Sequence, residues 1–156
     1  MKKVEKDFEE LLRLFNKHRV HYCIIGAFAV SFHAIPRYTK DLDVIVDPKE
    51  DNAIHIIGAL EEFGFKSLNL CPDDFLRKDG VIQLGFEPVR IDILTSVEGM
   101  DFDDIWRGRK RGRYGRELVN FAGIDALIRM KEKSGRKQDE ADIEILKKSK
   151  KKRSRH

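Results

Sequence analysis

Three aspartates in two apolar segments are the residues best suited to chemistry. Asp41 and Asp43 flank Leu42 at the start of an apolar run, and Asp92 lies between two isoleucines. Because side chains alternate between the faces of a strand, Asp41 and Asp43 would share one face and Leu42 would point to the other. Neighbouring carboxylates repel unless a cation lies between them, and oxygen ligands suit Mg²⁺ or Mn²⁺. The pattern predicts a metal site formed by Asp41, Asp43 and Asp92, provided that their strands are neighbours.

Two interpretations of these acids remain open. In the first, two Mg²⁺ ions held about 3.5–4 Å apart clamp a phosphoryl group and activate an attacking oxygen. In the second, Asp41 and Asp43 cap a turn or pair with Arg37 and Lys40. Asp92 favours the first interpretation, because an acid flanked by isoleucines in a strand is costly to bury without a partner.

The segments around the acids indicate an α/β (α+β) domain. Helical spacing, proline starts and glycine stops predict helices at 4–18, 27–34, 48–63, 101–106, 123–133 and 137–148. Apolar runs predict strands at 20–25, 42–46, 65–70, 81–86 and 89–94. The last two are close enough to form an antiparallel pair. Residues 107–116 read as a glycine-interrupted basic loop or hairpin.

Composition narrows the class of protein. A chain of 156 residues is long enough for one domain with a real core. No run approaches the roughly 18 apolar residues that span a membrane. Cys23 and Cys71 lack the spacing of a metal site, which favours a reducing, cytoplasmic setting.

Positive charge is concentrated at the C-terminus. The net charge is +4, but residues 147–156 hold seven Lys and Arg and no acid, so the remaining chain carries 24 bases against 27 acids, a net charge of −3. This distribution predicts a single domain over residues 1–146 and a basic, disordered tail over 147–156. The tail either contacts nucleic acid or only keeps the chain soluble.

Taken together, the motifs resemble the nucleotidyltransferase superfamily of the DNA polymerase β type. The chain looks most like the small bacterial and archaeal nucleotidyltransferases, which include relatives of the nucleotidyltransferase toxins of abortive-infection systems. The likeness rests on Gly26-Ala27-Phe28-Ala29 with His33, the run from Arg37 to Asp43, the apolar-Asp-apolar triplet at Asp92, and Lys131, Arg136, Asp139 and Asp142. It extends over most of the chain up to Leu146.

The resemblance implies a fold, a reaction and a set of roles. The fold would be a small mixed sheet flanked by helices, with two C-terminal helices closing a nucleotide cleft. The reaction would be metal-dependent transfer of a nucleoside monophosphate from an NTP to an unknown acceptor, with release of pyrophosphate. The acceptor would be a tRNA or other RNA, a protein hydroxyl or a small molecule, and a toxin–antitoxin partner follows only from the relatives.

The resemblance also assigns individual residues. Asp41, Asp43 and Asp92 would hold Mg²⁺ or Mn²⁺, and Asp92 would help to deprotonate the acceptor hydroxyl. The nucleotide phosphates would meet Gly26, Ala27, Arg37, Thr39, Lys131 and Arg136.

Several of these residues have a structural alternative. Arg37 and Thr39 could be turn residues, His33 is predicted to be packed or hydrogen-bonded, and the four charged residues of the C-terminal pattern could be structural. Ala27 departs from the family, which has Gly or Ser there, because alanine offers no hydroxyl and adopts positive φ only with strain. A catalytically inactive nucleotide- or RNA-binding module of the same fold and a metal-dependent hydrolase therefore remain as alternative functions.

Overall fold

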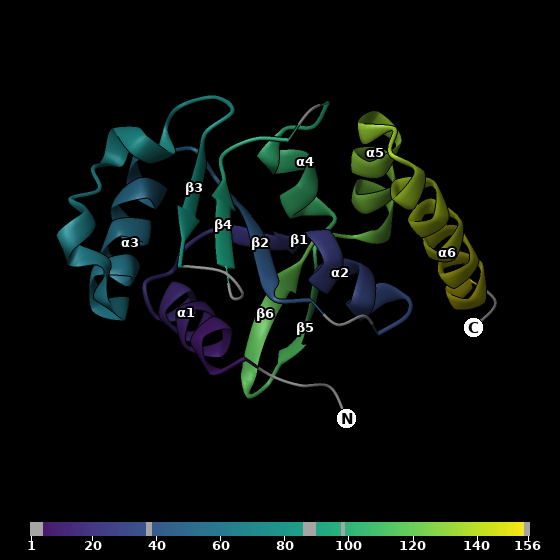
Figure 1. Ribbon diagram of the computed structural model, residues 1–156, viewed down its shortest axis with the longest axis horizontal. Helices are drawn as coiled ribbons and strands as arrows, with labels where there is room; N and C mark the ends of the chain where they lie inside the picture. The colour runs from purple at the N-terminus through teal and green to yellow at the C-terminus, as the bar shows by residue number, and fades with distance from the viewer. Residues whose placement is uncertain (1–4, 37–38, 86–89, 98, 155–156) are drawn as a thin grey trace.

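The structure, a computed structural model, describes residues 5–36, 39–85, 90–97 and 99–154, and in this part of the chain six strands form one mixed sheet (Figure 1). The strands are β1 (Tyr22–Ile25), β2 (Asp41–Val46), β3 (Val81–Leu84), β4 (Arg90–Leu94), β5 (Lys110–Tyr114) and β6 (Glu117–Phe121). Their order is β3-β4-β2-β1-β6-β5, with β2–β4 and β1–β6 parallel and the other neighbours antiparallel. The predicted α/β class is confirmed.

The described α-helices flank this sheet in two groups. They are α1 (Lys6–Lys17), α2 (Gly26–His33), α3 (Glu50–Leu60), α4 (Phe102–Arg107), α5 (Ile124–Ser134) and α6 (Lys137–Ser154). Helices α1 and α3 pack on one another, and α2 contacts α5 and α6 in a second group, while α4 lies against β1 (Figure 1). None of the helices in the described ranges has the length and apolar character that a membrane span requires.

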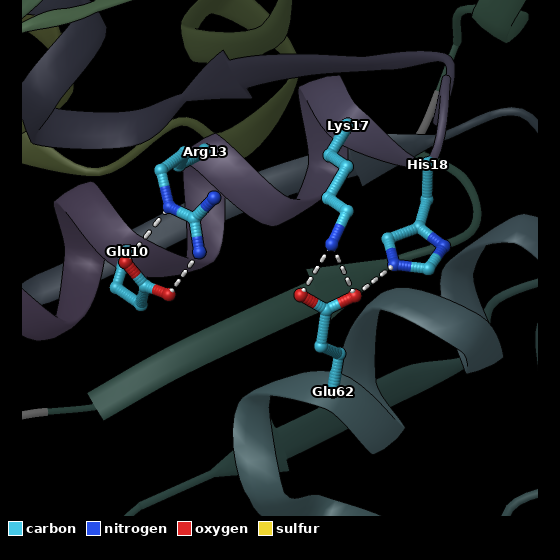
Figure 2. A network of polar contacts seen from close by, with 5 residues as sticks. All are labelled: Glu10, Arg13, Lys17, His18 and Glu62. Carbon is cyan, nitrogen blue, oxygen red and sulfur yellow. Dashed lines mark hydrogen bonds and ion pairs between the residues drawn. The ribbon is translucent and has the colours of Figure 1, made fainter.

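Helix α1 is amphipathic and buries one face. Phe8, Leu11, Leu12 and Phe15 are fully buried, as their spacing predicts. An exposed charge cluster joins the end of the helix to Glu62, in the turn after α3 (Figure 2).

In this cluster Glu62 is 2.8 Å from Lys17 Nζ and 2.9 Å from His18 Nε2, while Arg13 pairs with Glu10 within α1. Water screens such exposed pairs. The apolar face therefore does most to hold α1 in place.

Residues 65–70 and strand β6 differ from the sequence-based expectation. Residues 65–70 were predicted as a strand but form turns instead. A π-helical turn η1 (Glu61–Phe65) leads into a 3₁₀ turn η2 (Lys66–Leu68). A further 3₁₀ turn, η3, spans Pro72–Phe75. The strand prediction is wrong because Gly64 and Asn69 adopt positive φ values of 120° and 51°, which turn the chain. Strand β6 was not predicted, since it buries three consecutive residues and lacks clean alternation.

Helix α6 continues to Ser154, so residues 147–154 are helical where the sequence predicts a disordered tail. The Ser149 hydroxyl donates to the carbonyl of His33, and Lys150 Nζ lies 2.6 Å from Asp125 Oδ1. These contacts place the basic end of α6 against α2 and the start of α5.

Candidate active site

The acids meet where β2 and β4 run side by side. The parallel register pairs Asp43 with Asp92 and Asp41 with Arg90. Neighbouring strands lie about 4.8 Å apart and paired residues point to the same face, so the carboxylates of Asp43 and Asp92 are adjacent. Leu42 is buried on the opposite face. The structure thus brings together the two segments that the sequence analysis required to be neighbours.

This crowding of carboxylates disfavours the ionised form of Asp43. Burial, followed by the negative charges of Asp92 and Asp41, raises the pKa of Asp43 to about 6, although Arg90 acts in the opposite direction. Asp92 is 9% exposed, and its Oδ1 atom accepts no hydrogen bond from any described residue. A cation beside this pair would stabilise both carboxylates.

Gly26 allows α2 to begin directly against Asp43. Its φ is +70°, and a Cβ atom at this position would overlap Asp43 Oδ2. The positive φ falls on Gly26, whereas Ala27 continues into α2 with ordinary helical geometry. Ala27 is therefore unstrained, and the start of α2, with its free N–H groups and positive dipole end, lies beside the acids.

The donor chemistry at this position fits a divalent cation in part. Asp43 and Asp92 offer adjacent carboxylate oxygens, which are the ligands Mg²⁺ and Mn²⁺ prefer. Asp41 Oδ2 instead lies 3.6 Å from Arg90 Nη2. Among the described residues no group of three or more His, Cys, Asp or Glu side chains is already arranged to hold a metal ion. The three-acid ligand set stays a prediction, for which the structure supplies an adjacent pair.

Lys131 and Arg136 line a cavity that also reaches Gly26. The cavity has a volume of about 360 Å³ and is lined by Ile25 and Gly26, by the end of α5 and by the start of α6. Leu94, the last residue of β4, also lines it. The two C-terminal helices therefore border a cleft next to the start of α2, which is where the sequence analysis expected nucleotide phosphates.

Both cations also have acidic partners. Lys131 Nζ lies 3.1 Å from Asp139 Oδ1 and 3.0 Å from Asp142 Oδ2, and Arg136 Nε lies 3.0 Å from Asp139 Oδ2. Burial raises the pKa of Asp139, but hydrogen bonds from Ser134, Lys131 and Arg136 outweigh it and lower the pKa to about 2. The two acids are buried and join α5 to α6, whereas the Arg136 side chain is 79% exposed and accessible to a ligand.

Three further candidates have simpler positions. Thr39 Oγ1 accepts a hydrogen bond of 3.2 Å from the Asp41 N–H, which is the role of a turn residue just before β2. His33 is buried with Nε2 2.7 Å from the carbonyl oxygen of Ala122, so it is packed and hydrogen-bonded as predicted. Arg37 lies outside the described residues.

Arg90 is the residue of this site that sequence reasoning missed. It stands two positions before Asp92, so strand alternation alone places it on the acid face. Its guanidinium lies between the carboxylates of Asp41 and Asp92. Attention to the residues two positions from each strand aspartate would have found it.

The chain is similar in fold to several solved protein structures. No protein-family model matches the chain, and no curated protein sequence is significantly similar to it. Among solved structures, a proposed nucleotidyltransferase from Thermotoga maritima is similar with a TM-score of 0.59 and 14% identity, covering 92% of this chain and 94% of that one.

Two further solved structures are similar in fold. The lincosamide antibiotic adenylyltransferase LnuA, bound to lincomycin, has a TM-score of 0.58 and 20% identity, over 94% of this chain and 98% of its own. ANT(2″)-Ia in complex with adenylyl-2″-tobramycin has a TM-score of 0.55 and 11% identity, over 91% and 86%. Identities this low establish architecture rather than activity. The chain has the nucleotidyltransferase fold.

Proposed function

We propose that this protein transfers a nucleoside monophosphate from an NTP to a hydroxyl group of an acceptor, with the help of a divalent cation. The observation that carries the proposal is the parallel register of Asp43 and Asp92 beside the start of α2. Two of the similar structures are named as a lincosamide antibiotic adenylyltransferase and as a complex with adenylyl-2″-tobramycin, which supports this reaction class.

The nucleotide would lie in the cavity between α2 and the C-terminal helices. The N–H groups at the start of α2 offer hydrogen bonds to phosphate, and the helix dipole favours negative charge there. Arg136, which lines the same cavity, offers a guanidinium group suited to binding phosphate oxygens. These groups would hold the triphosphate with its α-phosphorus near Asp43 and Asp92.

In the proposed reaction, the acceptor oxygen attacks the α-phosphorus and the bond from that phosphorus to the bridging oxygen breaks. Pyrophosphate leaves with the electron pair of that bond, and the hydroxyl proton passes to Asp92. Mg²⁺ or Mn²⁺ held by Asp43 and Asp92, joined by Asp41, would neutralise charge on the phosphate oxygens. Asp43 would hold the cation in place, since ionisation at its position is otherwise unfavourable.

The acceptor belongs to one of three classes: an RNA end, a protein hydroxyl or a small molecule. The small-molecule class is supported by the lincomycin-bound adenylyltransferase and by the adenylyl-2″-tobramycin complex, which have the same fold. The RNA and protein classes, and a toxin–antitoxin partner, come from the resemblance described above.

Incubation with α-³²P-labelled NTPs, Mg²⁺ or Mn²⁺, and tRNA, protein, lincosamide or aminoglycoside acceptors tests the proposal. We expect labelled acceptor with the wild-type protein and a loss of about 100-fold or more in Asp43→Asn and Asp92→Asn. Asp73→Asn, at an exposed aspartate in η3, is the matched control and should retain activity.

Two outcomes contradict the proposal. Metal-independent NTP binding without transfer to any acceptor would identify a binding module. Label released into water, with none on an acceptor, would identify a hydrolase.

A further inference from the structure

Arg90 places a positive charge inside the acid centre. It pairs in register with Asp41 across the β2–β4 ladder and precedes Asp92 by two positions, so its side chain shares their face. Its backbone N–H donates to the carbonyl of Lys40 at 3.0 Å, which fixes the start of β4 against β2. The backbone therefore delivers the guanidinium to the acids.

The guanidinium contacts two carboxylates loosely. Arg90 Nη2 lies 3.6 Å from Asp41 Oδ2, and Nε lies 3.5 Å from Asp92 Oδ1. Charge-assisted hydrogen bonds are usually about 2.7–2.9 Å long, so both of these contacts are ion pairs longer than a hydrogen bond. Arg90 also stabilises the charged form of Asp43. One cation thus acts on all three carboxylates.

Arg90 does not satisfy the Oδ1 atom of Asp92 with a hydrogen bond. The atom is buried and accepts no hydrogen bond within the described ranges, and its ion-pair contact with Arg90 is 3.5 Å. Buried carboxylate oxygens are normally hydrogen-bonded or bound to a metal. This oxygen is therefore able to accept a closer cation than the guanidinium.

We propose that Arg90 is a tethered counter-ion of the acid centre, which neutralises Asp41 and Asp92 in the metal-free protein and withdraws when a divalent cation binds the same oxygens. Two cations on shared oxygens repel one another. The Arg90 side chain is 32% exposed, so it has solvent to move into. The inference rests on the metal site of the proposed function and adds to it a competing cation supplied by the chain itself.

Titration of the nucleotide-free, full-length protein with Mn²⁺ in a calorimeter tests this role. Arg90→Met and Arg90→Gln remove the competing charge and should tighten Mn²⁺ binding about tenfold or more. The same variants in EDTA should unfold at lower temperature, because the acids lose their counter-ion. A merely structural arginine would lower stability without tightening Mn²⁺ binding.

Two controls accompany these variants. Arg90→Lys keeps the positive charge and should bind Mn²⁺ much as the wild type does. Arg13→Met makes the same substitution at an exposed arginine on α1 that pairs with Glu10, and should change neither measurement. If Arg90→Met fails to fold, the polar side chain of Arg90→Gln provides the measurement.

Unchanged or weaker Mn²⁺ binding in the Arg90 variants overturns the counter-ion role, and so does the absence of Mn²⁺ binding in every protein. The two proposals fail separately. Transfer activity in the wild type together with unchanged Mn²⁺ affinity in the variants contradicts the counter-ion role alone. Tighter Mn²⁺ binding in the variants without transfer to any acceptor contradicts the proposed function alone.

Discussion

Asp43 occupies a position in which the folded protein disfavours its charge. Burial, Asp92 and Asp41 raise its pKa from 3.8 to about 6. A carboxyl group with a higher pKa in the folded state stabilises the fold while it is protonated, and this contribution is lost as pH rises through the folded-state pKa. At neutral pH the metal-free protein therefore holds a destabilising charge at the point where a cation would bind.

The first prediction follows from this shift. In EDTA, the free energy of unfolding should fall by on the order of 2 kcal/mol between about pH 4 and pH 6 and then level off. Asp43→Asn should reduce this fall and exceed the wild type in stability above pH 6. Burial also raises the pKa of Asp47, so Asp47 makes its own contribution to the pH dependence of stability in both proteins.

Urea denaturation from pH 4 to pH 8 provides the measurement, with Asp73→Asn as the control that keeps the wild-type slope. Parallel pH profiles for the wild type and Asp43→Asn would show that the Asp43 carboxyl is not perturbed. Asp139, with its lowered pKa, affects stability only as pH falls below about 4, outside this window.

At the scale of elements, two kinds of charge contact join neighbouring helices. Lys131 connects α5 to α6 through two buried acids, whereas Glu62 connects the turn after α3 to α1 at the surface (Figure 2). Burial decides their weight, because removing one member of a buried pair leaves an uncompensated charge, while water replaces a lost surface partner.

Lys131→Met should therefore destabilise the protein by on the order of 3 kcal/mol. Glu62→Gln, the surface counterpart, should unfold at nearly the wild-type denaturant concentration. Chemical denaturation at pH 7 compares them. Equal losses in the two variants would mean that the α5–α6 contacts are as well hydrated as the surface cluster.

At the scale of the whole molecule, charge is unevenly distributed. The chain up to Leu146 has a net charge of −3, and the seven Lys and Arg of residues 147–156 reverse the total to +4. Since α6 continues to Ser154, the described part of this charge is carried on a helix that packs against α2 and α5. Clustered cations of this kind bind polyanions in a salt-dependent way.

We expect Lys147→Glu/Lys148→Glu/Lys152→Glu to weaken binding to unstructured RNA about tenfold or more and to flatten its salt dependence. A control that changes net charge equally, Lys6→Glu/Lys66→Glu/Lys78→Glu, should have a smaller effect because these exposed lysines lie on other elements. Fluorescence anisotropy at several salt concentrations measures both. Equal weakening by the two sets would attribute RNA binding to net charge rather than to α6.

The sequence by itself determined the local features of this protein. Alternation along β2 predicted that Asp41 and Asp43 share a face, and helical periodicity predicted α1, because both patterns depend only on neighbours in the chain. The turn at Gly26 was visible for the same reason.

Only the tertiary structure decided which local features meet. The β2–β4 register, which sets Asp92 beside Asp43 and Arg90 beside Asp41, joins segments far apart in the chain. Such pairing depends on the packing of the whole sheet rather than on any local pattern. The structure also shows that the positive φ belongs to Gly26 and not to Ala27. Because Gly26 has no side chain, it leaves room for the Asp43 carboxylate.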